Sequence, residues 1–394
     1  MNIENASDIG KLRLDSLTVG YKGVPLISDI TMSLAKGEVL TLIGPNGSGK
    51  STILKSITRQ LAAISGAVYI DSRNMSVLSG KDIATKLAVV LTERIRPELM
   101  TCRELVSAGR YPYTGSFGLL TAHDKEIVDL SLERVHASEI ADKFVTEISD
   151  GQRQRILLAR AICQEPEIIV LDEPTSFLDI RHKIELLEIL SGMAKQQGIT
   201  VVMSLHEIDL AERISDKIVC VKGDRIYAYG TPEEIFTDEN ISRLYEIERG
   251  CFNPLIGCVE LSAPTGDTEC FVIGGGGKGI PFYRALQKAG IPFAAGIIPE
   301  NDIDMITASA LAGETVVSAP FTAADTELIN RAKGIIDRCR YIVDSGCPVG
   351  QYNTAADTLR EYAKANRKII ITELLEIPEI IHHIQTVHSQ STDI

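Results

Sequence analysis

Two short motifs in this chain have the residue types needed to bind and cleave a nucleoside triphosphate. The first, Gly44-Pro-Asn-Gly-Ser-Gly-Lys-Ser51, fits the pattern G-x-x-x-x-G-K-[ST] and follows the apolar run Val39–Ile43. Its glycines let backbone N–H groups turn onto phosphate oxygens, and the helix that follows directs its positive end at the same anion. We therefore predict that ATP contacts Gly44, Pro45, Asn46, Gly47, Ser48, Gly49, Lys50, Ser51 and Thr52.

The second motif supplies the carboxylates that triphosphate cleavage requires. Ile168-Ile-Val-Leu-Asp-Glu173 is an apolar strand that ends in two acids. In nucleotide hydrolysis a metal ion bridges two phosphates while another group orients the attacking water. Asp172 suits the metal, together with the Ser51 hydroxyl, and Glu173 suits the water. An apolar strand ending in Asp-Glu is a weak signal alone, but beside the phosphate loop it predicts an ATP hydrolase that uses Mg²⁺.

Three more segments complete an ordered set. Ile148-Ser-Asp-Gly-Gln152, here called the signature segment, lies between the two motifs, and Ser176-Phe-Leu-Asp179 and Ser204-Leu-His206 follow them. The signature segment is also compatible with a simple helix cap by Ser149 or Asp150. The order of all five elements nevertheless resembles the ATP-binding cassette (ABC) ATPase family, over about residues 12–245.

This resemblance implies a head-to-tail pair of subunits, so the chain is expected to work with a second copy of itself. Each ATP would lie between one subunit's phosphate loop and the other subunit's Ser149, Gly151 and Gln152, with Asp179 touching the partner's site. His206 would contact the γ-phosphate, and Tyr21 would stack on the adenine. A strand-end histidine and a core tyrosine are the structural alternatives for these last two residues.

The chain departs from the usual family pattern at two places. The signature segment has Ile148 and Asp150 where the family usually has leucine and glycine, but Ser149 and Gly151 keep their backbone donors. The second departure is Glu93, which aligns with a glutamine that senses Mg²⁺ and the attacking water in the family. A carboxylate there is able to bind Mg²⁺ but would repel phosphate, so Glu93 is a candidate for both the metal site and the catalytic site.

A further segment indicates the subclass. Glu104-Leu-Val-Ser-Ala-Gly-Arg-Tyr-Pro-Tyr-Thr-Gly115 is similar to ATPases that serve iron–siderophore, haem and cobalamin permeases. The resemblance implies a metal-chelate importer, most simply of the iron–siderophore class, with cobalamin or haem as alternatives. Partners would be transmembrane permease subunits, contacted near Arg110–Gly115, and indirectly an extracytoplasmic substrate-binding protein. The chain would sit peripherally on the cytoplasmic face of the membrane.

Composition agrees with this interpretation and excludes others. The chain has 394 residues and a formal net charge of −13, which gives it no general attraction for nucleic acid. It has neither a signal-peptide pattern at its start nor an apolar run long enough to span a membrane. A soluble ABC ATPase of translation or DNA maintenance is the alternative from another class, although such proteins usually carry two cassettes or a long coiled coil.

The elements that must position these residues alternate between short apolar strands and helices, which indicates a mostly parallel sheet. Turn-forming residues cluster after residue 246, and a second strand–helix alternation begins at residue 269. We therefore predict an α/β protein with an ABC-type P-loop domain at 1–246, a linker at 247–268, a smaller doubly wound Rossmann-like domain at 269–375, and a tail at 376–394.

The second domain has a glycine-rich loop of its own. Gly274-x-Gly276-x-x-Gly279 follows an apolar run and precedes a helical stretch, and Glu300 and Asp302 follow at about the spacing of a dinucleotide-binding fingerprint. Four consecutive glycines satisfy many templates, so a small-ligand site and a purely structural turn both remain open. A nicotinamide-dependent activity is a third alternative. By resemblance, this half matches extensions of some metal-chelate ABC ATPases, and we expect a regulatory domain that biases dimerisation.

The remaining metal-ligand residue types form no recognisable motif. Most of the cysteines are expected to be buried thiols, because none forms a C-x-x-C pair. Cys251 and Cys258 lie closer together than the others, and a metal or redox role for them is the less favoured reading. His382, His383 and His388 in the tail lack carboxylate or cysteine neighbours and are expected to be solvated.

Overall fold

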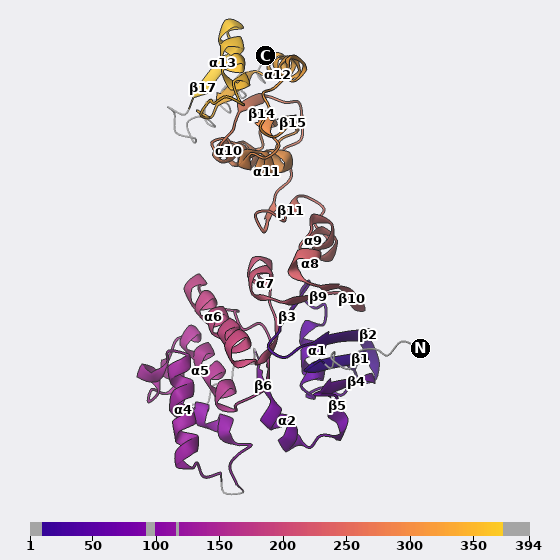
Figure 1. Ribbon diagram of the computed structural model, residues 1–394, viewed down its shortest axis with the longest axis vertical. Helices are drawn as coiled ribbons and strands as arrows, with labels where there is room; N and C mark the ends of the chain where they lie inside the picture. Colours follow the sequence, from indigo (N-terminus) through magenta and orange to yellow (C-terminus); the bar gives the residue numbers. More distant parts are fainter. Residues whose placement is uncertain (1–9, 92–98, 116–117, 373–394) are drawn as a thin grey trace, which may run out of the picture. The chain divides into compact units, whose positions relative to one another are not determined.

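Two groups of short apolar strands give the chain two separate cores. The computed structural model describes residues 10–91, 99–115 and 118–372. It divides into two compact units, Met1–Tyr245 and Glu246–Ile394 (Figure 1). Each unit is described by itself below.

The first unit is built on a six-stranded sheet in the order β10-β9-β3-β8-β7-β6. All neighbouring pairs are parallel except β9 and β10, which pair antiparallel. Every residue of the central strands β3, β7 and β8 is buried, as expected for a parallel sheet covered on both faces. The strands are β3 Val39–Ile43, β6 Leu87–Val90, β7 Ile168–Leu171, β8 Thr200–Ser204, β9 Lys217–Lys222 and β10 Arg225–Gly230.

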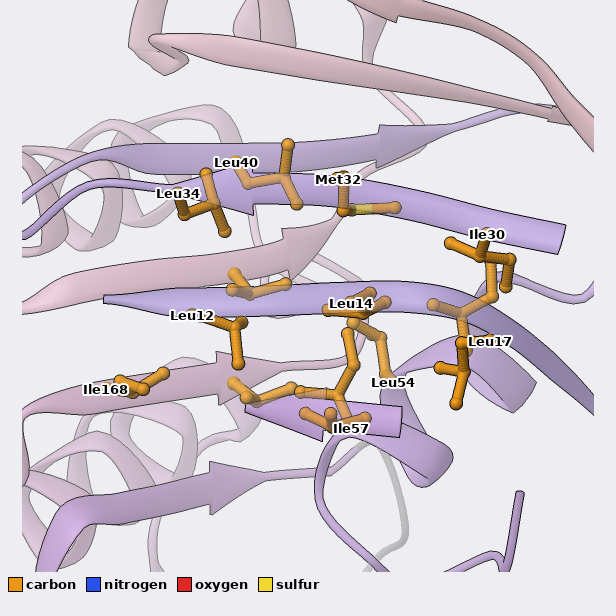
Figure 2. Packing of buried hydrophobic residues seen from close by; sticks show 14 of the residues in the cluster. Leu12, Leu14, Leu17, Ile30, Met32, Leu34, Leu40, Leu54, Ile57 and Ile168 are labelled. Carbon is orange, nitrogen blue, oxygen red and sulfur yellow. The ribbon is translucent and has the colours of Figure 1, made fainter. Parts of the chain in front are cut away.

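A four-stranded antiparallel sheet, in the order β2-β1-β4-β5, forms a second layer of this unit. Its strands are β1 Leu12–Tyr21, β2 Val24–Leu34, β4 Ser65–Ile70 and β5 Arg73–Asn74. Helix α1, Lys50–Ile57, packs against it: Figure 2 shows Leu54 and Ile57 facing Leu12 and Leu14 of β1. All four side chains are fully buried, so the helix that follows the phosphate loop is anchored by apolar packing.

Helices α2 to α6 of the first unit begin at polar caps. Side chains of Ser79, Thr101, Thr121, Ser149 and Asp179 each accept a backbone N–H at the start of α2 to α6 respectively. Helices α3 and α4 pack against α5. The helices are α2 Gly80–Lys86, α3 Cys102–Ser107, α4 Ala122–Arg134, α5 Asp150–Cys163, α6 Ile180–Gln197, α7 Ile208–Ile214, α8 Pro232–Ile235 and α9 Asp238–Tyr245.

The second unit is a doubly wound α/β domain, which confirms the predicted fold class. Its five parallel strands run in the order β15-β14-β13-β16-β17. Helices α10 and α11 cover one face, and α12 and α13 cover the other. The elements are β13 Cys270–Ile273, α10 Ile280–Ala289, β14 Phe293–Pro299, α11 Ile303–Leu311, β15 Glu314–Ser318, α12 Thr326–Arg338, β16 Tyr341–Asp344, α13 Ala355–Ala365 and β17 Ile369–Thr372.

The segment predicted as a linker contains a hairpin of its own. Strands β11, Cys251–Asn253, and β12, Cys258–Glu260, pair antiparallel within residues 247–268. Arg284 of α10 forms an ion pair with Glu260 at 2.8 Å, and this segment is grouped with the second unit. The predicted limits of the four segments stay a prediction.

In the part of the chain that the structure describes, helices long and apolar enough to cross a bilayer are absent.

Candidate functional site

The phosphate loop adopts a backbone that requires glycine. Gly44, Gly47 and Gly49 have φ angles of 146°, 78° and 96°, in the region that side-chain-bearing residues rarely adopt. At Gly44 there is also no space, because a Cβ atom would lie 2.2 Å from the backbone carbonyl oxygen of Val221. The loop therefore depends on both the conformational freedom and the small size of its glycines.

Helix α1 begins differently from helices α2 to α6, since it starts at Gly49 without a side-chain cap. The first-turn N–H groups of an uncapped helix need an acceptor, and an anion satisfies them. The Ser48 hydroxyl in the same loop is buried and lacks a hydrogen-bond partner among the described residues. Both features fit a bound phosphate group.

Lys50 is held inside the loop that it is predicted to serve. Its ammonium donates to the carbonyl oxygens of Gly44 at 2.7 Å and Pro45 at 2.9 Å, and the residue is buried. Burial lowers the pKa of Lys50, and the negative charges of Glu173 and Asp172 act in the opposite direction. The Lys50 ammonium is therefore attracted by the charges of both acids, and it lies in the same loop that would bind the phosphate.

Ser51, Asp172 and Ser204 form a connected group at the carboxyl ends of the parallel strands. The Ser51 hydroxyl donates to Asp172 at 3.1 Å, and the Ser204 hydroxyl donates to the same carboxylate oxygen at 2.7 Å. Asp172 is buried at the end of β7, while Ser204 ends β8. Two of the three predicted metal-ligand residues, Ser51 and Asp172, are thus brought together by the sheet.

Glu173 and His206 meet directly. Nε2 of His206 lies 2.6 Å from Oε1 of Glu173, and the Ser176 hydroxyl donates to the other carboxylate oxygen at 3.2 Å. Glu173 has a φ of 48°, a left-handed conformation that is uncommon outside glycine, and its N–H donates to Ser204 Oγ at 2.9 Å. Ser204 therefore links the orientation of Glu173 to that of Asp172.

Tyr21 lies beside the first turn of α1. Its hydroxyl is 3.3 Å from Oγ1 of Thr52, and half of the residue is exposed, at 51%. An exposed ring next to the phosphate loop is a poor match for the core-tyrosine alternative and a good one for stacking on a base.

The signature segment lies at the surface and is capped as well. Oγ of Ser149 accepts the N–H of Gln152 at 3.2 Å, and the Gln152 side chain accepts the N–H of Ser149 at 3.0 Å, which is a capping box. A hydroxyl that accepts still has its own proton to donate, so the cap leaves Ser149 able to bind a partner's ligand. Asp150 forms an ion pair with Arg153, which neutralises the carboxylate that departs from the family pattern.

The other predicted contacts have mixed outcomes. Asp179 is exposed at the start of α6. Glu93 lies outside the described residues, as do His382, His383 and His388. Arg110 is buried against Asp124 at 2.9 Å and Glu165 at 2.7 Å, so this residue is structural and cannot form part of an exposed edge, whereas Tyr111 beside it is 78% exposed.

Two functional candidates were not predicted from the sequence. Ser204 stands in the quoted Ser-Leu-His stretch, but only its position at the end of the strand next to β7 reveals its bonds to Asp172 and Glu173. Glu207 accepts a hydrogen bond from the Thr175 hydroxyl at 2.9 Å and pairs with Lys183. Neither contact is local in sequence, so spacing alone gives no signal for it.

The glycine-rich loop of the second unit is already filled by the chain's own carboxylates. Asp304 is fully buried and accepts the N–H groups of Gly275 at 2.5 Å, Gly279 at 2.8 Å and Ile280 at 3.3 Å. Asp302 accepts the N–H of Gly276 at 2.8 Å. These are the amides that a pyrophosphate would need, and two carboxyl groups of the chain itself already accept their hydrogen bonds. The residues do not fit a dinucleotide, which removes the basis for the nicotinamide alternative.

The cysteines show no metal or redox site among the described residues. Six of them are buried, and Cys251 and Cys258 are half-buried. In the β11–β12 hairpin Cys251 pairs with Glu260 and Cys258 with Asn253, so the two thiols are not directly opposite one another. Burial raises the pKa of the Cys258 thiol, which makes it less reactive. Groups of three or more potential metal ligands are absent from the described residues.

The fold and this arrangement of residues are those of an ATP-binding cassette ATPase. The family model described as "ABC transporter" matches residues 27–176. An uncharacterised ABC transporter ATP-binding protein of Methanocaldococcus jannaschii, MJ0873, is 43% identical over 278 residues, which is 70% of this chain and 96% of that protein. The chain belongs to the ABC transporter ATP-binding protein family, whose members hydrolyse ATP in transport.

Two further similarities indicate where in this family the chain lies. The iron(3+)-hydroxamate import ATP-binding protein FhuC of Bacillus subtilis is 36% identical over 61% of this chain and 89% of its own length. A solved metal-chelate type ABC transporter in an inward-facing conformation matches with a TM-score of 0.53 and 28% identity, over 59% of this chain and 88% of that one. A separate family model, named MJ0874, matches residues 293–386 of the second unit.

We predict that Ser204→Ala slows ATP hydrolysis about tenfold or more while ATP binding is little changed. Without the hydroxyl, Asp172 and the N–H of Glu173 lose their shared partner, whereas the phosphate loop is untouched. Steady-state ATPase assays with nucleotide-binding measurements test this, with Ser76→Ala at an exposed serine as the control. Unchanged turnover in Ser204→Ala would remove the linking role.

We predict that Asp304→Asn loosens the glycine loop of the second unit. An amide oxygen replaces a carboxylate that accepts three backbone N–H groups, so hydrogen exchange at Gly275, Gly279 and Ile280 should accelerate about tenfold or more. The exposed Asp267→Asn is the matched control. The unaltered chain should leave NADH fluorescence unchanged, and saturable NADH binding would contradict the filled-loop interpretation.

Proposed function

We propose that this ABC ATPase drives an importer for a metal chelate of the iron–siderophore class. The observation that carries the proposal is the convergence of Asp172, Glu173, Ser204 and His206 beside an uncapped phosphate loop. The substrate class is supported by the similarity to FhuC and to the metal-chelate type transporter. Cobalamin and haem remain the alternatives within the same class.

The phosphate end of ATP would be held by groups that lack better partners in the chain alone. Lys50 would exchange its contacts with the carbonyls of Gly44 and Pro45 for the β- and γ-phosphates, which relieves part of the cost of burying its charge. Ser51 and Asp172 supply the hydroxyl and carboxylate oxygens that Mg²⁺ prefers. When bound there, Mg²⁺ would neutralise phosphate charge.

Glu173 would orient and activate the attacking water. Ser176 and His206 hold its carboxylate, and the Ser204 hydroxyl fixes its backbone, so the group is placed before substrate arrives. His206 is the one of these residues predicted to reach the γ-phosphate. Its contact with Glu173 would therefore connect the presence of that phosphate to the position of the base.

The exposed signature segment and Asp179 would complete the site of a second copy of the chain. Ser149, Gly151 and Gln152 would contact the partner's ATP, and closure of the pair on ATP would be relayed to permease subunits in the membrane. Tyr111 and Tyr113 are exposed aromatic residues in the segment predicted to face the permease. An extracytoplasmic binding protein would deliver the chelate.

We predict that tagged Glu173→Gln, purified with ATP from its own membranes in mild detergent, retains a polytopic membrane protein. Loss of the carboxylate prevents water activation but leaves ATP binding, so the closed pair should persist on its permease. ATP turnover should fall by at least about a hundredfold. Turnover is measured by phosphate release, and the retained proteins by mass spectrometry.

Lys50→Ala is the matched control, because it should lose ATP binding and with it the closed pair. Rapid turnover by Glu173→Gln would refute the role of this residue as the base. Recovery of the chain as a free dimer, or with ribosomes or DNA-maintenance factors, would contradict transport while leaving the ATPase assignment intact.

We also propose that the Rossmann-like domain of the second unit, with proposed limits 269–375, regulates dimerisation of the cassette. The family model that matches this unit is named MJ0874, and the similar ATP-binding protein is MJ0873. A family model separate from that of the cassette thus matches this part of the chain. Because carboxylates already accept the amides of the glycine loop, a regulatory ligand would bind to another part of the unit and not through a phosphate at that loop.

Removal of the second unit should change the ATPase rate about fivefold or more, which is the usual scale of coupling between two sites. The cassette should survive the cut, since FhuC carries no more than a short additional part beyond the matched 89% of its length. A chain ending at residue 246 is compared with one ending at 375. Equal ATPase rates and equal permease assembly in the two chains would contradict a regulatory role.

A further inference from the structure

The first turn of helix α6 touches both surface elements that a subunit would offer to its partner's ATP. Asp179 precedes this helix and accepts the backbone N–H of His182 at 2.9 Å. The same carboxylate oxygen lies 2.8 Å from Nδ1 of the His182 ring. Asp179 is therefore held twice by one residue, once through the backbone and once through the imidazole.

The other side of the His182 ring lies against the signature segment. A Cβ atom added to Gly151 would lie 3.3 Å from Cγ and 3.4 Å from Nδ1 of His182, so the ring packs on the bare Cα of that glycine. Gly151 belongs to the first turn of α5, immediately after the cap at Ser149. One imidazole thus contacts the Asp179 carboxylate and the backbone of the signature segment.

We propose that His182 is a positioning residue that fixes Asp179 and the signature segment relative to each other. The proposal rests on the head-to-tail pairing proposed above, in which both elements approach the same ATP of the partner. Held by His182, they form one rigid surface and do not have to be ordered separately when the pair closes.

The exposure of these residues explains why such a constraint matters. The side chain of Asp179 is 64% exposed, and that of His182 only 30%. An exposed carboxylate loses rotamer freedom when it is ordered at an interface, and a contact that orders it beforehand lowers that cost. The less exposed imidazole supplies this contact.

The same turn is also connected to the chain's own catalytic residues. Lys183, the next residue of α6, forms an ion pair with Glu207, which follows His206. His206 in turn contacts Glu173. Adjacent residues of one helical turn therefore contact the partner-facing surface and the segment that carries His206.

We expect His182→Ala to weaken ATP-driven dimerisation of the full chain roughly five- to tenfold in the Glu173→Gln background. ATP binding by the monomer should be unchanged, because the phosphate loop has no contact with His182. His182→Asn should restore much of the lost affinity, since its amide is planar and able to donate to Asp179. Sedimentation with ATP measures dimerisation, and a fluorescent nucleotide at low protein concentration measures monomer binding.

His123→Ala is the matched control, because His123 is an exposed helical histidine whose side chain is 73% accessible. Equal dimerisation of His182→Ala and its Glu173→Gln parent would overturn the proposal. So would a parallel loss of monomer ATP binding that His182→Asn does not rescue, since this result indicates general damage to the fold. Failure of the Glu173→Gln parent itself to dimerise would overturn the head-to-tail pairing. This outcome differs from failure of the His182 proposal, because it is seen in a chain whose His182 is unaltered.

Discussion

The structure of the first unit depends on the placement of one buried ammonium and two acids at the same edge of a parallel sheet. Lys50 follows β3, Asp172 and Glu173 follow β7, and β8 lies between these strands and ends at Ser204. Burial disfavours the charge on Lys50, and the acids offset part of that cost. The hydroxyl of Ser204 connects both acids through hydrogen bonds. The strands that carry these residues are buried, and this burial keeps the interactions between the charges strong, because water at an exposed site would screen them.

The two glycine-rich loops show how similar motifs have different outcomes. Each loop follows a parallel strand and leads into a helix, and each contains glycines with positive φ. At α1 the amides have no side-chain cap, whereas at α10 the carboxylate of Asp304 takes them. The acid comes from the helix after the next strand. Because Asp304 accepts these amides within the chain, the second loop fits a structural turn, one of the alternatives left open by its sequence.

Sequence patterns predicted the local parts of this structure well, for physical reasons. Strand β3 has the bounds of the predicted apolar run, Val39–Ile43, because that run is short and ends at a glycine. The phosphate loop is equally local, since its function lies in consecutive residues. Contacts between distant residues gave no such signal: Ser204 with Asp172, Asp304 with Gly279, and His182 with Gly151. Arg110 was misplaced at an exposed edge because its buried partners are distant.

The unusual signature segment illustrates how such distant and local contacts combine. A carboxylate at position 150 would repel a phosphate brought close to it, but Arg153, one helical turn away, pairs with Asp150 and also donates to the carbonyl of Ile148. The substitution is therefore neutralised within the segment that carries it. Gly151 has a different constraint, because the His182 ring occupies the space of a side chain there. Arg153 of α5 thus neutralises the charge at position 150, whereas His182 of α6 limits the space at position 151. The arrangement of these surface residues consequently depends on side chains of both helices and not on the signature residues alone.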